Sequence, residues 1–157
     1  MDTMTVRSEH PYTMKPFVFL GGTVGNSKWR DPFTERLIAV GVPGERIFNP
    51  VVADWNEEFQ KKEDAAKLAS EYLLFYICNT QQPELPVSTY GIVEAVMHLY
   101  DKPKVTVAVF DLQGLDGHVL KALSKSEKDL RARFPQGYIF SSADEAIAFF
   151  AGKAGGK

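Results

Sequence analysis

YLLFYIC, at residues 72–78, contains no charged side chain, no glycine and no proline. An apolar run of this length is typical of a strand buried on both faces of a parallel sheet, because a half-exposed strand would alternate polar and apolar residues. We therefore predict that residues 72–78 form the central strand of a sheet. The single cysteine, Cys78, excludes an intramolecular disulfide, and we interpret it as a small buried residue, with a reactive thiol as the alternative.

A second apolar run, PFVFL at residues 16–20, ends in Gly21 and Gly22. This pattern predicts a buried first strand followed by a tight turn. A polar segment then leads to a helix, for which Asp31 is the predicted N-cap and Pro32 the first residue. Gly22 suits either the turn itself or the close approach of a ligand to the backbone, and the sequence leaves both open.

Strands and helices alternate through the rest of the chain. Further strands are predicted at residues 46–48, 104–110 and 138–140, and further helices at residues 57–70, 88–100 and 119–133 and after a cap at Ser141 or Ser142. Five such units predict an α/β fold: a single doubly wound, flavodoxin-like or Rossmann-like sheet of five parallel strands with helices on both faces. The expected strand order is 2-1-3-4-5, which places a ligand crevice between the first and third strands.

The chain has 157 residues, which is the length of one ordinary domain. We expect a flexible leader at residues 1–15, the α/β domain at residues 16–151 and a frayed tail at residues 152–157. The leader lacks the apolar centre of a secretory signal, and no apolar run approaches the ~20 residues that span a bilayer. These features predict a cytoplasmic protein without a membrane partner.

The charge balance argues against a nucleic-acid partner. A net charge of −2 provides no basic face for duplex nucleic acid, so a small-molecule ligand is the better prediction. The three histidines show no ligand spacing, and no metal is predicted. GGTVGN at residues 21–26 is neither the dinucleotide fingerprint nor a P-loop, and no cofactor is predicted.

STYGIVEAVMHLY, at residues 88–100, places one carboxylate, Glu94, near the start of an otherwise apolar helix. The helix follows the central strand, so Glu94 is expected at the carboxyl edge of the sheet, where open α/β folds bind ligands. Glu94 and His98 are spaced i, i+4, and an ordinary exposed pair is the alternative.

Other side chains are expected to meet Glu94 at this edge. They are the carboxylates Asp54 and either Glu63 or Asp64, the aromatic residues Trp29, Trp55 and Tyr90, and the helix start at Ser88. Such a set suits cleavage of a bond between a sugar and a base. One carboxylate can stabilise or trap the oxocarbenium-like transition state while an acidic group protonates the leaving group, and aromatic faces can hold the base.

Four short motifs, in order and spacing, resemble the nucleoside 2-deoxyribosyltransferase family and its N-glycosidase relatives. They are FLGGTV at residues 19–24, FNP followed by DW within residues 48–55, an acidic residue about eight positions before the third strand, and a glutamate in the helix after it. The similarity covers about residues 17–109. It implies that Glu94 is the nucleophile that attacks the anomeric carbon and holds the sugar covalently. Glu63 is the implied second catalytic residue, with Asp64 as the alternative register, and Asp54 is the third.

The resemblance implies a nucleoside or nucleoside 5′-monophosphate as the substrate. The expected substrate-binding residues are Gly21, Gly22, Thr23, Arg30, Asn49, Trp55, Ser88, Thr89 and Tyr90. Ser88 stands where the monophosphate glycosidases carry a serine, which suggests room for a phosphate at the helix N-terminus. Arg30 could contact that phosphate or be a solvated charge, and Trp55 could stack on the base or cover the core.

The sequence also departs from the family pattern. Val18 and Phe19 occupy the part of the first strand where nucleoside-type transferases place a tyrosine, and Tyr90 or Tyr76 could take its place. No counterpart exists for the C-terminal part that completes a neighbour's site, so transfer to water is an alternative to transfer to a base. The family implies a homo-oligomer. Two other functions stay open: a non-catalytic nucleotide-sensing or partner-binding module, and an enzyme like the NAD glycohydrolases.

Overall fold

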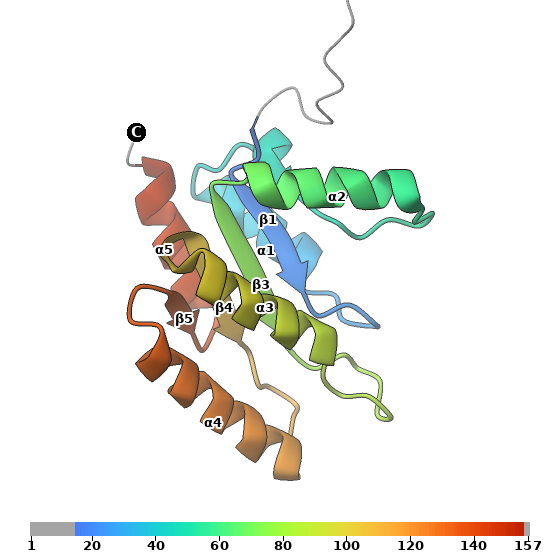
Figure 1. Cartoon of the computed structure of the whole chain (residues 1–157), viewed down its shortest axis with the longest axis vertical. Coiled ribbons are helices and arrows are strands. Elements are labelled where there is room, and N and C mark those ends of the chain that lie inside the picture. Colours follow the sequence, from blue (N-terminus) through green and yellow to red (C-terminus); the bar gives the residue numbers. More distant parts are fainter. Residues whose placement is uncertain (1–14, 156–157) are drawn as a thin grey trace, which may run out of the picture.

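The computed structural model describes residues 15–155, so residues 1–14 of the predicted leader lie outside the described part. Five parallel strands form one sheet in the order β2-β1-β3-β4-β5, which confirms the predicted topology (Figure 1). The strands are β1 (Val18–Gly22), β2 (Ile47–Phe48), β3 (Tyr72–Ile77), β4 (Thr106–Phe110) and β5 (Tyr138–Phe140). The uninterrupted apolar run therefore does form the central strand, paired with β1 on one side and β4 on the other.

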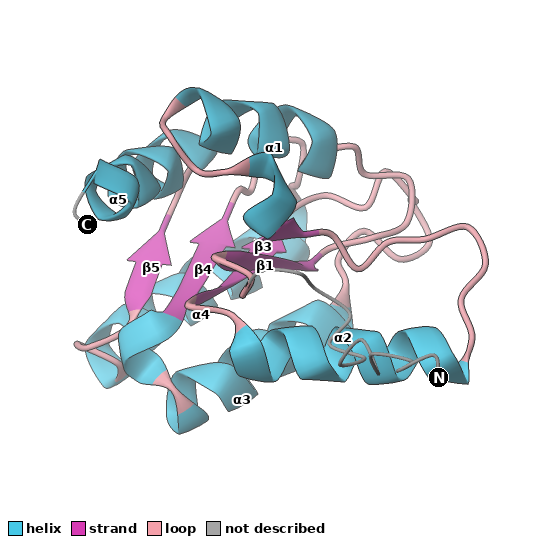
Figure 2. Cartoon of the chain, turned by 90° about the horizontal axis from the view of Figure 1, so that it is seen from above, coloured by secondary structure: helices cyan, strands magenta, loops and turns pink. Residues whose placement is uncertain are grey.

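The helices cover both faces of the sheet, as predicted. They are α1 (Arg30–Ala39), α2 (Glu57–Ala69), α3 (Thr89–Asp101), α4 (Gly117–Arg133) and α5 (Ala143–Gly155), with 3-10 turns at Gly44–Arg46 and Pro103–Val105. Helices α1 and α5 pack on one face, and α2, α3 and α4 pack on the other (Figure 2). Successive side chains of β3 point to opposite faces of the sheet. Leu74 and Tyr76 therefore pack in the core under α1 and α5, and Leu73 and Phe75 pack in the core under α2, α3 and α4.

The first helix begins earlier than predicted. Trp29 occupies the N-cap position without a side-chain cap bond, so the prediction that Asp31 is the N-cap was wrong. Asp31 and Pro32 lie within the first turn, where the Asp31 carboxylate faces the positive end of the helix dipole. Arg30 is buried and bonded to carbonyl groups at the end of β1, and this tertiary contact sets the start of the helix.

The last helix ends later than predicted. Helix α5 continues to Gly155, whereas fraying was expected from residue 152. At the N-terminal end of α5, Ser142 provides the predicted cap, because its Oγ accepts a hydrogen bond from the Glu145 amide at 3.2 Å.

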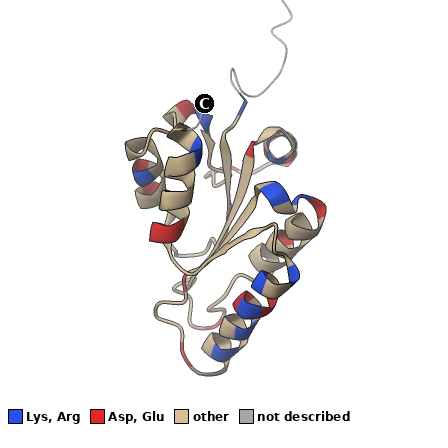
Figure 3. Cartoon of the chain, turned by 90° about the vertical axis from the view of Figure 1, so that its left-hand side faces the viewer, with Lys and Arg blue, Asp and Glu red and all other residues tan. Residues whose placement is uncertain are grey.

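Within residues 15–155, none of the helices is long and apolar enough to cross a membrane. On the side of the molecule shown in Figure 3, Lys and Arg are interspersed with Asp and Glu along the helices.

Candidate active site

The chain changes direction at the carboxyl ends of β1 and β3. The two strands are paired in register from Val18 with Tyr72 to Gly22 with Tyr76. After β1 the chain passes to α1 on one face, and after β3 it passes to α3 on the other. A crevice opens at such a point because the two connections diverge.

A cavity of about 330 Å³ lies at this point, on the side of the sheet covered by α2 and α3. Eight of the residues that the sequence predicted as catalytic or substrate-binding line it: Gly21, Gly22, Arg30, Trp55, Glu63, Ser88, Tyr90 and Glu94. Its other walls are Phe19, Val24, Pro50, Val51, Val52 and Gly91. The cavity thus combines two carboxylates with a largely apolar wall.

Glu94 is buried in this wall and is only 9% exposed. It comes this close to the sheet because Gly91, one turn earlier, lets α3 approach β1. A Cβ atom on Gly91 would lie 3.3 Å from the Cα of Gly22. The Nδ1 atom of His98 lies 2.8 Å from the carbonyl oxygen of Glu94 and not against its carboxylate, so the exposed Glu94–His98 pair does not form.

Lys67 of α2 is the partner of the Glu94 carboxylate. Its Nζ donates a hydrogen bond to Oε2 of Glu94 at 2.8 Å, and Oε1 of Glu63 lies 3.7 Å from the same nitrogen. Burial acts to lower the pKa of Lys67, but the hydrogen bond and charge of Glu94, together with the charge of Glu63, raise it above its ordinary value. The sequence analysis missed Lys67. Its only sequence signal is the i, i+4 spacing from Glu63.

Glu63, not Asp64, is the acidic residue of α2 that lines the cavity. Asp64 is exposed, one position further along the helix. Burial raises the pKa of Glu63 above its ordinary value; Lys67 opposes this effect, and the charges of Glu94 and Asp64 add to it. A carboxyl group in this environment keeps its proton to higher pH and can act as a general acid.

Arg30 lines the cavity with a guanidinium that is already engaged. Nη1 donates to the carbonyl oxygen of Thr23 at 2.7 Å, and Nε and Nη2 donate to Leu20 and Gly22 at 3.2 and 3.4 Å. The guanidinium also lies 4.5 Å from the ring centroid of Trp29. Burial lowers the pKa of Arg30 to about 10. Of the two alternatives for Arg30, the solvated charge is excluded, because the buried guanidinium holds the turn after β1 in place.

Two aromatic residues stand at the mouth of the cavity, and a third does not. Trp55 and Tyr90 are 57% and 67% exposed and line the opening, so their faces are available to a flat ligand. Trp29 instead stacks on Tyr76 with ring centroids 4.5 Å apart and donates to the Thr23 carbonyl oxygen at 2.8 Å. Trp29 is thus part of the framework on the α1 side.

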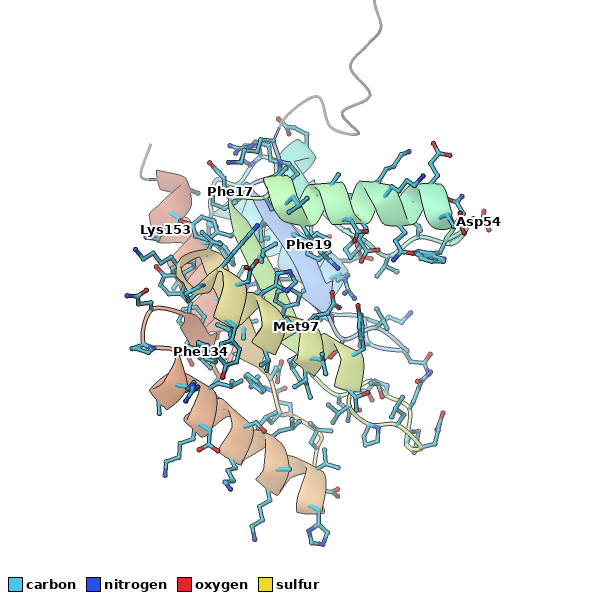
Figure 4. The ribbon with its side chains drawn as sticks, in the orientation of Figure 1. Phe17, Phe19, Asp54, Met97, Phe134 and Lys153 are labelled. Carbon is cyan, nitrogen blue, oxygen red and sulfur yellow. The ribbon has the colours of Figure 1, made fainter. Side chains whose placement is uncertain are left out.

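Four of the predicted site residues lie outside the lining of the cavity. Thr23 is buried, and its hydroxyl bonds to the main chain of Cys78, which ties the ends of β1 and β3 together. Asn49 accepts a hydrogen bond from the Val51 amide within its own turn. Thr89 is exposed in the first turn of α3. Asp54 is exposed at the outer end of α2 (Figure 4), because the extended loop before α2 turns the side chains of Val51, Val52 and Trp55 toward the cavity instead.

Ser88 is the N-cap of α3, and its hydroxyl accepts a hydrogen bond from the Gly91 amide at 3.2 Å. The N-terminus of the helix, with its positive dipole end, therefore faces the cavity.

Two other cavities lie along the same edge of the sheet. One, of about 350 Å³, is lined by amide side chains and Asp116; the other, of about 330 Å³, lies on the α1 side around Tyr76, Cys78 and Asp111. Neither contains a pair of carboxylates. Cys78 is partly buried, and this burial raises the pKa of its thiol to about 11, which disfavours the reactive thiolate.

The hydroxyl of Tyr76 donates to Asp111 at 2.6 Å on the α1 side of the sheet. Tyr76 therefore cannot replace the tyrosine that is absent from the first strand, whereas Tyr90 lines the cavity that contains Glu94.

The fold and the cavity together define a doubly wound α/β protein with two carboxylates at its topological switch point. Comparisons of the chain with models of protein families, with curated proteins and with solved structures gave no match. Among residues 15–155, no group of three or more His, Cys, Asp or Glu is placed to hold a metal ion.

Proposed function

We propose that this protein cleaves the N-glycosidic bond of a (deoxy)nucleoside or its 5′-monophosphate through Glu94 and passes the sugar to another base or to water. One observation carries the proposal. Glu94 and Glu63 line the same cavity as Gly21 and Gly22, and Lys67 joins the two carboxylates. The motif resemblance to the nucleoside 2-deoxyribosyltransferases points to the same reaction.

The charges in the cavity suit the two roles that this reaction needs. A nucleophile must be an anion, and Lys67 donates a hydrogen bond to the carboxylate of Glu94. A general acid must carry a proton, and burial raises the pKa of Glu63, which favours its protonated form. Glu63 would protonate the base as it leaves.

The two carboxylates are close enough for the retaining geometry. Because Oε2 of Glu94 and Oε1 of Glu63 lie 2.8 and 3.7 Å from the same Nζ, these oxygens are at most about 6.5 Å apart. Retaining glycosidases place their carboxyl groups roughly 5–5.5 Å apart, whereas inverting enzymes leave about 6.5–9.5 Å for a water molecule. The upper limit accommodates the retaining separation, in which Glu94 would hold the sugar covalently.

The remaining walls suit the parts of a nucleoside. Gly21 and Gly22 present backbone without side chains, so a sugar ring can approach the sheet closely. Trp55 and Tyr90 offer faces for the base at the mouth. The N-terminus of α3 at Ser88 offers a favourable position for a 5′-phosphate.

The proposal is tested by incubating the protein with deoxynucleosides, ribonucleosides and their 5′-monophosphates, with and without a foreign base. Chromatography then measures free base and exchanged nucleoside. Base release or exchange is the expected result, and its absence across the panel at high protein concentration would refute the proposal. Thermal stabilisation by a nucleotide without turnover would favour the sensing module instead, and release of nicotinamide from NAD would favour a glycohydrolase of that dinucleotide.

Replacing Glu63 with glutamine removes the proposed general acid. We expect kcat to fall by about 10²-fold, the usual contribution of a positioned acid. In the wild type, activity should be present while Glu63 is protonated and should fall as pH rises through its raised pKa; the variant should lose this dependence. A pH profile of kcat measures both effects. Asp64→Asn, one position away on the exposed face, is the matched control: it should keep the pH dependence, displaced only slightly to lower pH because the charge of Asp64 contributes to the raised pKa of Glu63.

The outer face of α3 carries a row of exposed apolar side chains. Tyr90, Val93, Met97 and Tyr100 are each about half exposed or more and follow the i, i+3, i+7, i+10 spacing of a coiled-coil seam. We propose that this seam, on which Met97 is labelled in Figure 4, forms the interface of a homo-oligomer. Its first residue, Tyr90, also lines the cavity, so the interface would border the site.

Met97→Glu should shift the protein toward the monomer, because it places a charge at the middle of the seam. Sedimentation velocity over a concentration series measures the shift. Ile38→Glu, an equally exposed apolar position on α1, is the control and should leave association unchanged. A wild-type protein that sediments as a monomer at every concentration would contradict the prediction.

A further inference from the structure

Lys67 is placed between two carboxylates from different helices. Its Nζ is 2.8 Å from Glu94 on α3 and 3.7 Å from Glu63 on its own helix, and it lies 5.4 Å from the ring centroid of Phe19 below. The side chain is largely buried, at 17% exposure. A shift of the ammonium by about 1 Å would exchange the close partner for the distant one.

The charges around Glu63 come from three helices. Lys67 and Asp64 lie on α2, Glu94 lies on α3, and the Arg30 guanidinium of α1 interacts with both Glu63 and Glu94. Tyr90 of α3 interacts with Lys67. Among these groups, Arg30 is fixed by main-chain carbonyls, whereas Lys67 contacts the two carboxylates themselves.

We propose that Lys67 is a shared counter-ion, and that it transfers from Glu94 to Glu63 whenever Glu94 loses its negative charge. The physical reason is the cost of a buried charge without a partner, which is much larger than the cost of a small movement of a flexible lysine side chain. Lys67 is thus a positioning residue that sets the protonation state of Glu63 according to the state of Glu94.

The consequence for the reaction rests on the proposed function. In the first step an oxygen of the Glu94 carboxylate forms a bond to C1′ of the sugar, and the bond from C1′ to the base nitrogen breaks. The electron pair of the broken bond goes to the base, which takes the proton of Glu63 and leaves as the neutral base. Glu94 is now a neutral ester and Glu63 a carboxylate.

In the second step Glu63 accepts a proton from water, or from an N–H group of an incoming base, as the oxygen or nitrogen attacks C1′. The bond from C1′ to Glu94 breaks, and Glu94 regains its negative charge. One lysine cation and one carboxylate anion are present in the cavity before and after each step. Lys67 follows the negative charge from Glu94 to Glu63 and back, so Glu63 changes from acid to base without an unpaired charge.

The exchange can be tested without turnover, because Glu94→Gln imitates the uncharged ester. The titration of the Glu63 carboxyl group is followed by carbon-detected NMR in the full-length wild type, in Glu94→Gln and in Lys67→Met. Glu94→Gln should lower the pKa of Glu63 because the charge of Glu94 is lost and because the ammonium then has Glu63 as its remaining close carboxylate. The same substitution in a Lys67→Met background measures the first effect alone, and the decrease should be smaller there. Lys67→Met by itself should raise the pKa of Glu63, because that counter-ion is gone.

Two variants serve as controls for these titrations. Lys67→Arg keeps the cation and should restore a titration close to that of the wild type. Glu71→Gln breaks an ion pair of 2.9 Å with Arg46 far from the cavity and should change nothing. If Lys67→Met fails to fold in a thermal melt, Lys67→Gln takes its place in both backgrounds. A decrease in the pKa of Glu63 on Glu94→Gln that is equally large with and without Lys67 overturns the inference.

Kinetics then separates this inference from the proposed function. With an active wild type, Lys67→Met should lose about 10²-fold in kcat with little change in KM, and Lys67→Arg should recover most of the loss. If the pKa of Glu63 changes as predicted but no nucleoside is turned over, the shared counter-ion is supported and the proposed function is refuted. If the pKa of Glu63 changes as predicted but Lys67→Met has the kcat of the wild type, Lys67 has no role in the reaction.

Discussion

Glu94→Gln should abolish base release, with a loss in kcat of at least about 10³-fold, while the protein stays folded. A glutamine amide cannot form the covalent bond to C1′ that the proposed reaction requires. The fold should survive because glutamine has nearly the same shape and Glu63 is close enough to become the partner of the Lys67 ammonium. Base release measured by chromatography, beside a thermal melt, tests both parts of this expectation.

A second replacement at the same position identifies the nucleophile more directly. Glu94→Ala should leave room beside Lys67 for a small anion, and azide should then restore cleavage and yield a glycosyl azide. Glu71→Gln is the matched control, since it removes a carboxylate from an ion pair of similar length that is not part of the cavity. Turnover of Glu94→Gln at the wild-type rate would exclude Glu94 as the nucleophile.

Gly22→Ala should destabilise the protein by about 3 kcal/mol or more. Gly22 has a φ of +110°, which side chains rarely adopt, and a Cβ atom there would lie 2.3 Å from the carbonyl oxygen of Tyr76 and 2.4 Å from its nitrogen. The clash is with the backbone of β3, so no side-chain rotation relieves it. The ends of β1 and β3 would have to separate, and the cavity would be deformed with them.

Urea denaturation of the two proteins measures this difference in the free energy of unfolding. Gly152→Ala is the control, because Gly152 lies in α5, a Cβ atom would meet nothing within 4 Å, and a helical alanine should stabilise by about 0.5–1 kcal/mol. Equal stability of Gly22→Ala and the wild type would show that Gly22 is not needed for the turn. It would also remove the argument that this glycine shapes the cavity.

Local sequence patterns were sufficient for the sheet but not for every helix end. The apolar runs predicted all five strands, because a buried parallel strand needs side chains that are apolar on both faces, and the alternation of strands with helices predicted their order. The predicted start of α1 was wrong because Asp31 resembles an N-cap, whereas the helix that contains the buried Arg30 begins two residues earlier.

For the candidate site, the sequence indicated which residues carry chemistry but not which of them share a cavity. Glu94 and the glycines could be placed at one edge because the carboxyl ends of parallel strands lie together. Asp54 was expected there as well, yet its loop turns it to solvent. Lys67 gave almost no signal, because its contact with Glu94 joins residues of two different helices.

The sequence by itself determined the alternation of strands and helices, the position of β3 at the centre of the sheet and the presence of a carboxylate in an apolar helix. These follow from local periodicity and side-chain polarity, which each short segment carries alone. Only the tertiary structure decided that Lys67 joins Glu94 to Glu63, that Arg30 supports the turn after β1, and that Glu63 rather than Asp64 faces the cavity. Those outcomes depend on how α2 and α3 pack over the sheet, because the cost of burying a charge is met by partners that come from other elements.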